Sequence, residues 1–249
     1  MSRKYLLPLV VVCVAAIVSV GGIGRAGASP PLPTTLARVA VYASTTYGTD
    51  VLNKLRATHR FASVDSLGND CSEAPTPTLS TLQHYRAVLV YSDCDFNDNV
   101  AIGNVLADFV DEGGRVVVAT FAFWDPIEGL GMGGRLSTGG YLPLTQGDQT
   151  SGTEMTLVPD QPSSQLLAGV TTFDGGTSSY HNDSLALAPG AQLVAHWSGD
   201  GEPLVAYKGH VVALNFYPPS SDARGDFWKS TTGGVRLMTN ALLWGTLPN

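Results

Sequence analysis

The sequence predicts a three-layer α/β sandwich whose sheet is mainly parallel and gains an antiparallel extension toward its C-terminal end. Three short apolar runs rich in β-branched residues lie at Ala37–Ser44, Arg86–Asp93 and Arg115–Phe123. Continuous runs of this kind are typical of parallel strands that are covered on both faces. Helical patterns separate the runs, and the resulting βαβ order implies right-handed crossovers and an open sheet.

The parallel half alternates helix and strand patterns. Residues 48–58 carry apolar side chains at helical spacing, and the weaker run Arg60–Ser66 predicts a further strand. Residues 97–114 predict a second helix that begins at Asn97 or Asp98 and ends at a pair of glycines, which are typical residues at those two positions.

A long segment rich in Gly, Ser and Thr, Asp125–Glu154, follows the third run. A loop of that length in a compact domain is either functional or mobile. Its letters Gly129-x-Gly131-x-x-Gly134 match the dinucleotide-binding fingerprint. The motif is separated from its strand and no helix is expected after it, so nucleotide binding is not predicted.

The second half then predicts a meander and a final helix. In chain order, we expect a strand at Glu154–Val158, a short helix at Pro162–Val170, antiparallel strands at Ala191–Ser198, Glu202–Lys208 and His210–Tyr217, and a helix at Ser230–Trp244. No repeat or second domain is evident, so residues 37–249 are predicted to form one domain.

Residues 1–28 have the three parts of an export signal: an early positive charge, an apolar run, and small residues at Ala26-Gly27-Ala28. An uncleaved membrane anchor is the alternative, because the run is nearly long enough to span a bilayer. Residues 29–36 are rich in proline and predict an extended lead-in. We therefore expect a secreted, periplasmic or cell-surface protein, which contacts a membrane only through this segment if it is uncleaved.

Charge and cysteine content narrow the possible partners. The segment before Ser29 carries three of the 14 basic residues and none of the 21 acidic ones, so the remaining chain has a formal charge of −10 (11 basic minus 21 acidic). That charge repels nucleic acid, which is excluded as a partner.

Cys71 and Cys94 each follow a predicted parallel strand and are expected to form a disulfide in an oxidising compartment.

Several phrases resemble a known family. They are "FVDEGGRVVVATF", "SSQLLAGVTTFDG" and "GHVVALNFYPPSSD…LMTNALLWG", and together they span most of residues 37–249. The chain resembles the class I glutamine amidotransferase-like fold, which is flavodoxin-like in its layers, and within it the divergent group that includes trehalose-utilisation-like proteins.

The resemblance also implies that the family's catalytic groups are missing. The nucleophilic cysteine of the family corresponds to Phe121, and its histidine and glutamate correspond to Tyr217 and Pro219. A phenyl ring cannot form a thioester, and a neutral tyrosine is no base near pH 7. The resemblance therefore predicts a protein that does not hydrolyse glutamine. No cofactor is expected.

The carboxyl ends of the predicted parallel strands are the expected place for a ligand, as in other open α/β sheets. Aromatic faces beside carboxylates suit a sugar or another polar molecule, although the same aromatics would also fit packing beneath the glycine-rich segment. The candidate ligand-binding residues are those at the strand ends together with His181 from the second half of the chain: Tyr47, Asp93, Asp95, Trp124, His181 and Tyr217.

Two other chemistries stay open at this point. His181 has Asp183 two residues further on and hydroxyl side chains around it, which would suit a hydrolase acting on carbohydrate or ester bonds, although no G-x-S-x-G motif is present. Asp93, Asp95 and Asp98 resemble the start of a calcium loop but lack its glycine and its closing glutamate.

The sequence thus predicts an exported, non-catalytic module that binds a small polar ligand or a protein partner. The alternatives are an extracytoplasmic hydrolase and a component of a surface assembly, for which an exposed apolar patch would be expected.

Overall fold

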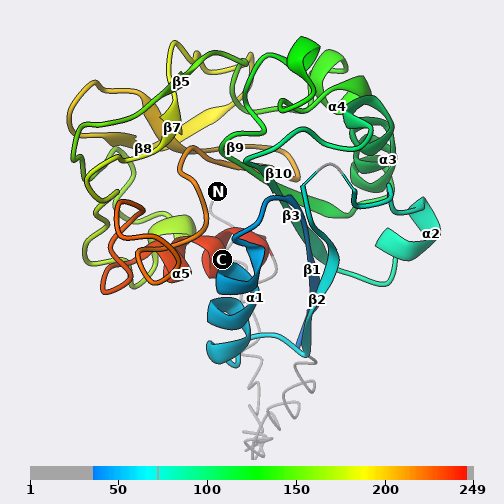
Figure 1. Cartoon of the computed structure of the whole chain (residues 1–249), viewed down its shortest axis with the longest axis horizontal. Helices are drawn as coiled ribbons and strands as arrows, with labels where there is room; N and C mark the ends of the chain where they lie inside the picture. Colours follow the sequence, from blue (N-terminus) through cyan, green and yellow to red (C-terminus); the bar gives the residue numbers. More distant parts are fainter. Residues whose placement is uncertain (1–35, 72, 246–249) are drawn as a thin grey trace, which may run out of the picture. The chain divides into compact units, whose positions relative to one another are not determined.

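The computed structural model describes residues 36–71 and 73–245. The predicted export signal and nearly all of the lead-in lie outside these residues. The described chain forms one eight-stranded sheet in the order β2-β1-β3-β4-β10-β9-β8-β6 (Figure 1). The bounds are β1 (Arg38–Ser44), β2 (Ser63–Asn69), β3 (Ala87–Ser92), β4 (Arg115–Ala119), β6 (Leu157–Pro159), β8 (Gln192–Trp197), β9 (Pro203–Lys208) and β10 (Val211–Leu214).

The first five strands in this order are parallel. The side chains of β1, β3, β4 and β10 are almost all buried on both faces, as the apolar runs predict, whereas those of the edge strand β2 are mostly half-buried. In β3 and β4 every residue is buried. The register aligns Val41 with Leu89, Leu89 with Val117, and Val117 with Val212. The fold class is therefore confirmed.

Helices cover the two faces of the sheet separately (Figure 1). One face packs against α1 (Gly48–Ala57) and α5 (Gly234–Leu242), and the other packs against α2 (Leu79–Leu82), α3 (Asn99–Asp111) and α4 (Gly134–Thr138). Each face of the sheet thus has its own apolar core, which gives the three layers.

Helix α3 shows how local sequence signals produce this layering. The carboxylate of Asp98 caps its first turn by accepting a hydrogen bond from the backbone N–H of Ala101 at 2.8 Å. Its inner side chains Ile102, Leu106 and Phe109 are buried, and each such burial stabilises the fold by about 2 kcal/mol. Gly113 follows with φ of 88°, a conformation that glycine adopts without strain.

The antiparallel extension consists of β9, β8 and β6 beside β10. Gly201 and Gly209 lie in its tight turns with φ of 81° and 53°, as the hairpin prediction requires. The predicted short helix at Pro162–Val170 is instead a single 3₁₀ turn, η2 (Gln165–Leu167).

Two strands end earlier than predicted. Strand β4 stops at Ala119 rather than Phe123 because the backbone turns, with the Ala122 N–H bonded to the Ala119 carbonyl at 3.0 Å. Strand β10 stops at Leu214 rather than Tyr217, and Phe216 N–H bonds back to the Leu214 carbonyl at 2.8 Å. Both turns place aromatic residues at the carboxyl ends of the parallel strands.

The glycine-rich segment is more structured than predicted. It contains the 3₁₀ turn η1 (Pro126–Glu128), helix α4 and strand β5 (Gln149–Thr150), which pairs with β7 (His181–Asn182). A helix therefore does follow the glycine motif. Its Gly133 and Gly134 lie against α3, where a side chain on Gly103 would lie 1.9 Å from the Gly133 carbonyl oxygen, so these glycines allow close backbone packing.

The same segment supplies part of the core. Met132, Leu136, Leu142 and Leu144 are buried against the α3 side of the sheet, and Arg135 forms ion pairs with two aspartates of α3. These side chains and ion pairs fix the segment to the domain, so it is a packed part of the fold and not a long loop without structure of its own. Among the described residues, no helix is long and apolar enough to cross a membrane.

Candidate functional site

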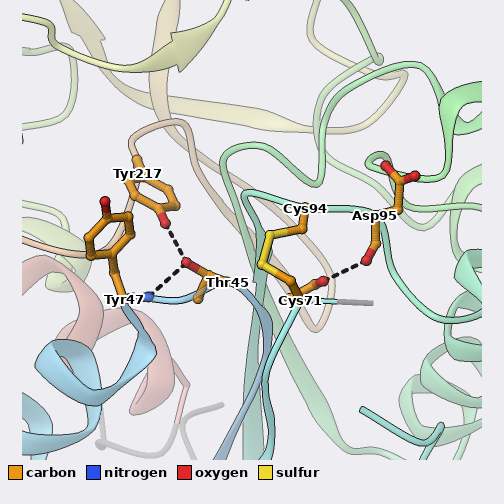
Figure 2. The surroundings of a disulfide bond; sticks show 7 residues. Thr45, Tyr47, Cys71, Cys94, Asp95 and Tyr217 are labelled. Carbon is orange, nitrogen blue, oxygen red and sulfur yellow. Dashed lines mark hydrogen bonds between the residues drawn. A yellow bond between two sulfur atoms is a disulfide. The ribbon is translucent and has the colours of Figure 1, made fainter. Parts of the chain in front are cut away.

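Four parallel strands bring candidate residues to the same edge of the sheet. Thr45 follows β1, Asp93 follows β3, Phe121 follows β4 and Tyr217 follows β10. Because neighbouring parallel strands end at the same edge, residues far apart in sequence meet there. Figure 2 shows Thr45 and Tyr217 facing each other, next to Tyr47.

Two aromatic rings stack at this edge. The rings of Phe121 and Tyr217 lie 5.4 Å apart between centroids at an interplanar angle of 25°, an offset-stacked range. The Tyr217 hydroxyl shares a 2.6 Å hydrogen bond with the Thr45 hydroxyl. Burial raises the pKa of Tyr217 far above its usual value, so the phenol stays neutral and is no base at physiological pH.

A cavity of ≈ 180 Å³ opens over these rings. It combines aromatic faces with a carboxylate, an amide and a guanidinium, a combination typical of small-molecule sites. Its lining residues are Asp93, Phe121, Gln149, Tyr180, Tyr217, Arg224 and Phe227.

Asp93 is the carboxylate of the cavity. Asp93 is exposed to solvent, but packing around its carboxyl group raises the pKa of Asp93, and the Tyr217 hydroxyl and the positive charge of Arg224 lower it by smaller amounts. The ionised form is thus less well solvated than in water. A ligand hydroxyl or cation would supply the missing interactions.

Arg224 faces the cavity from the connection between β10 and α5 and is held in a fixed orientation. Its Nε and Nη2 groups donate to the two carboxylate oxygens of Asp226 at 2.6 and 2.9 Å. Nη2 also donates to the Tyr180 hydroxyl at 2.7 Å, and the guanidinium lies 4.2 Å from the Phe227 ring centroid. The guanidinium hydrogen bonds hold the pKa of Asp226 down to about 2.

Asn215 fixes the end of β10 next to the site. Its buried side-chain oxygen accepts from the Thr120 hydroxyl at 2.9 Å and from Asn182 N–H at 2.8 Å. Its amide nitrogen donates to the carbonyls of Asn182 and Pro203 at 2.8 and 2.9 Å. One satisfied amide therefore joins the turn after β4 to β7 and β9.

Four of the six predicted residues do not line the cavity. Tyr47 lies beside it, edge-on to Phe227 at 5.3 Å between centroids. The carboxylate of Asp95 lies next to Gly129 of the glycine-rich segment and away from Tyr47 and Tyr217 (Figure 2). Trp124 is not among the lining residues, and its carbonyl accepts a hydrogen bond from Gln146 at 2.9 Å.

His181 lies in a different place, on β7. Its Nδ1 is 2.6 Å from the Ser179 carbonyl oxygen and its Nε2 is 2.9 Å from a carboxylate oxygen of Asp200. The ring is buried and lies 5.4 Å from Trp197 between centroids. Both nitrogens thus have partners and neither partner is a hydroxyl, so His181 does not form a base–nucleophile pair.

Asp93, Asp95 and Asp98, which resemble the start of a calcium loop in the sequence, lie in three different places. Asp98 caps α3, Asp95 lies by Gly129, and Asp93 lines the cavity. Within residues 36–71 and 73–245, no group of three or more His, Cys, Asp or Glu side chains could hold a metal ion.

The predicted disulfide between Cys71 and Cys94 is present, with Cα atoms 5.3 Å apart (Figure 2). Cys71 lies after β2 and Cys94 after β3, and these strands flank β1 on both sides. The bond therefore links the strands on either side of β1, next to Asp93.

Sequence reasoning missed Gln149, Tyr180, Arg224 and Phe227. A usable signal was the sequence Arg224-Gly225-Asp226-Phe227, which follows the last parallel strand. The connection that leaves that strand starts at the carboxyl ends of the parallel strands, where a ligand is expected. Its charged and aromatic residues were therefore candidates for the site in the same way as the residues at the strand ends.

Comparison with known proteins places this architecture in a fold family. Neither a protein-family model nor a curated protein matches the chain. A ThuA-like protein from Bacteroides uniformis superposes with a TM-score of 0.53 and 13% identity, covering 87% of this chain and 94% of its own. The Trypanosoma brucei CTPS glutaminase domain with bound acivicin has a TM-score of 0.47 and 10% identity, covering 83% and 93% of the two chains. The superposition on the ThuA-like protein shows that the chain shares that protein's fold, as the resemblance to trehalose-utilisation-like proteins predicts.

Proposed function

We propose that this chain is an exported binding module that holds a small polar ligand, such as a sugar, in the cavity over Phe121 and carries out no amidotransferase reaction. The observation that carries the proposal is the stacked pair Phe121 and Tyr217 at the strand ends. The family resemblance implies the nucleophile and the base at these two positions, and neither side chain can supply that chemistry.

The composition of the cavity supports a polar, hydroxyl-bearing ligand. The rings of Phe121, Tyr180 and Phe227 border the cavity, and the half-buried Tyr180 offers a ring against which the apolar face of a sugar packs. Asp93 accepts hydrogen bonds from ligand hydroxyls, while Gln149 both donates and accepts. A volume of ≈ 180 Å³ suits one small ring better than an extended chain.

The pre-set orientation of Arg224 supports binding as the function. Its bonds to Asp226 and Tyr180 fix the guanidinium before a ligand arrives, which lowers the entropic cost of binding. Export is supported by the disulfide, because such bonds persist in oxidising compartments.

Isothermal titration calorimetry with a panel of neutral monosaccharides and disaccharides tests the proposal. We expect at least one sugar to bind, and Asp93→Asn to weaken it about tenfold, since a charge-assisted hydrogen bond contributes about 1.5–3 kcal/mol. Asp95→Asn is the matched control, because it makes the same change outside the cavity, and it should bind normally. If no sugar binds, or if both variants weaken binding equally, the proposal is wrong.

A further inference from the structure

A second cavity lies between the end of α1 and the start of α5 and has no residue in common with the cavity over Phe121. Its volume is ≈ 320 Å³, and its lining residues are Thr58, Arg60, Thr232, Val235, Arg236 and Thr239. This volume lies in the range of small-molecule sites. Among the described residues that line it there is no carboxylate.

The charge of this cavity is unusual for so acidic a chain. Most described cations are already bound: five are in ion pairs (Arg38, Lys54, Arg135, Arg224 and Lys229), and three donate to backbone carbonyls (Arg56, Arg115 and Lys208). Among residues 36–71 and 73–245, the side chains of Arg60, Arg86 and Arg236 make no such bond. Two of these three arginines line the same cavity.

The start of α5 adds to the positive potential. The helix begins at Gly234 and its N-cap residue, Gly233, makes no side-chain cap. Val235 and Arg236 of its first turn line the cavity, so the cavity lies beside the positive end of the helix dipole. Helix α1 ends at the same cavity, but its carbonyls at Leu55 and Arg56 already accept bonds from Thr58 and His59.

The three threonines that line the cavity indicate which polar groups a ligand presents besides an anion. Their hydroxyls donate to the carbonyls of Leu55, Lys229 and Val235 at 2.7, 2.7 and 2.8 Å. With the proton of each hydroxyl used, these oxygens can only accept hydrogen bonds. Thr58 and Thr232 already accept one backbone N–H each, from Arg60 and Asp174 at 3.3 Å, and each keeps one lone pair for a ligand. A ligand that fits therefore presents hydroxyl donors to the threonines and an anion to the arginines.

We propose that the cavity between α1 and α5 binds a hydroxylated molecule that carries an oxyanion, namely the carboxylate of a sugar acid or the phosphate of a sugar phosphate. The two guanidiniums donate to the oxyanion, for which their planar fork is suited. The threonine oxygens accept from the hydroxyls, and Val235 contacts the carbon skeleton.

Titration calorimetry with glucuronate, glucose 6-phosphate, glucose and inorganic phosphate tests the site in the unmodified protein. We expect one of the two acidic sugars to bind at least about tenfold more tightly than glucose and than phosphate. The tighter of the two identifies the anion as carboxylate or phosphate. Equal binding of glucose, equal binding of free phosphate, or no binding of either acidic sugar overturns the proposal.

Arginine variants locate the site. Arg60→Gln and Arg236→Gln should each weaken the acidic sugar about tenfold, whereas Arg86→Gln, an equal loss of an exposed and unbound guanidinium elsewhere, should change its Kd less than twofold. Equal weakening by all three variants would mean general charge attraction and would overturn the proposal. Asp93→Asn should leave this binding unchanged, which separates the result from that of the cavity over Phe121.

Discussion

The cavity over Phe121 and the surroundings of His181 contain similar chemical groups but use them differently. Both have a carboxylate, aromatic rings and a cavity of comparable size, ≈ 180 and ≈ 170 Å³. The His181 nitrogens are occupied by Ser179 and Asp200, whereas burial of Asp93 raises its pKa because its charge is incompletely solvated. The comparison shows that a residue can bind a ligand when the fold leaves its polar atoms with fewer hydrogen bonds than they can make.

The largest expected effect comes from the disulfide, which borders the Phe121 cavity and not the His181 cluster. Replacing Cys71 and Cys94 with serine should lower the free energy of unfolding by about 3 kcal/mol, because the bond closes a loop with a sequence separation of 23. Urea denaturation measures the loss, with the reduced wild type as the control. Alkylation of both thiols in the absence of reductant would show that the bond does not form.

His181→Ala is expected to destabilise the fold by about 2–3 kcal/mol, because it removes a buried ring and its polar contacts with the Ser179 carbonyl and the Asp200 carboxylate. Sugar binding to the folded variant should be unchanged. The matched control is His196→Ala, which removes a half-exposed histidine paired with Asp160 at 2.8 Å and should cost less than about 1 kcal/mol. Loss of binding with intact stability would instead make His181 a ligand residue.

Phe121→Cys is expected to cost about 2–3 kcal/mol of stability, since it removes a buried ring that stacks on Tyr217. It should not create glutaminase activity, because the family's histidine and glutamate positions hold Tyr217 and Pro219 and no base activates the thiol. Ammonia release from glutamine measures this. Turnover by the wild type would disprove the correspondence of these positions.

Most of the fold could be predicted from the sequence because buried parallel strands leave a strong signal. The runs at β1, β3 and β4 are continuous and β-branched, and the caps of α3 are explicit in Asp98 and Gly113. The ends of β4 and β10 were misplaced, because aromatic residues continue the apolar run after the backbone has turned. Tertiary contacts, which periodicity does not report, decide where such strands stop.

The site could be predicted only in part, for the same reason. Asp93 and Tyr217 follow strands, and topology alone brings them to the same edge. Arg224 and Tyr180 reach the cavity from irregular connections, whose paths depend on packing such as the Arg224–Asp226 ion pair. Trp124 follows a strand as well, yet the early turn after β4 takes it out of the cavity lining.

The pH dependence of stability tests most directly whether Asp93 is kept for a ligand at a cost to the fold. A carboxyl group with a raised pKa binds its proton more tightly in the native state than in the unfolded chain. Stability is therefore highest when Asp93 is protonated, and it falls as the pH rises from the unfolded value through the raised native pKa.

Urea unfolding of the wild type and Asp93→Asn between pH 3 and pH 7 is the decisive measurement. The variant should gain stability relative to the wild type as the pH rises, by less than about 1 kcal/mol because solvent screens a partly exposed charge. Asp226→Asn is the control of opposite sign: Asp226 has a pKa of about 2, so its variant should lose relative stability as the pH rises. If Asp93→Asn is instead less stable than the wild type at pH 7, Asp93 is a structural residue and the account of the site is wrong.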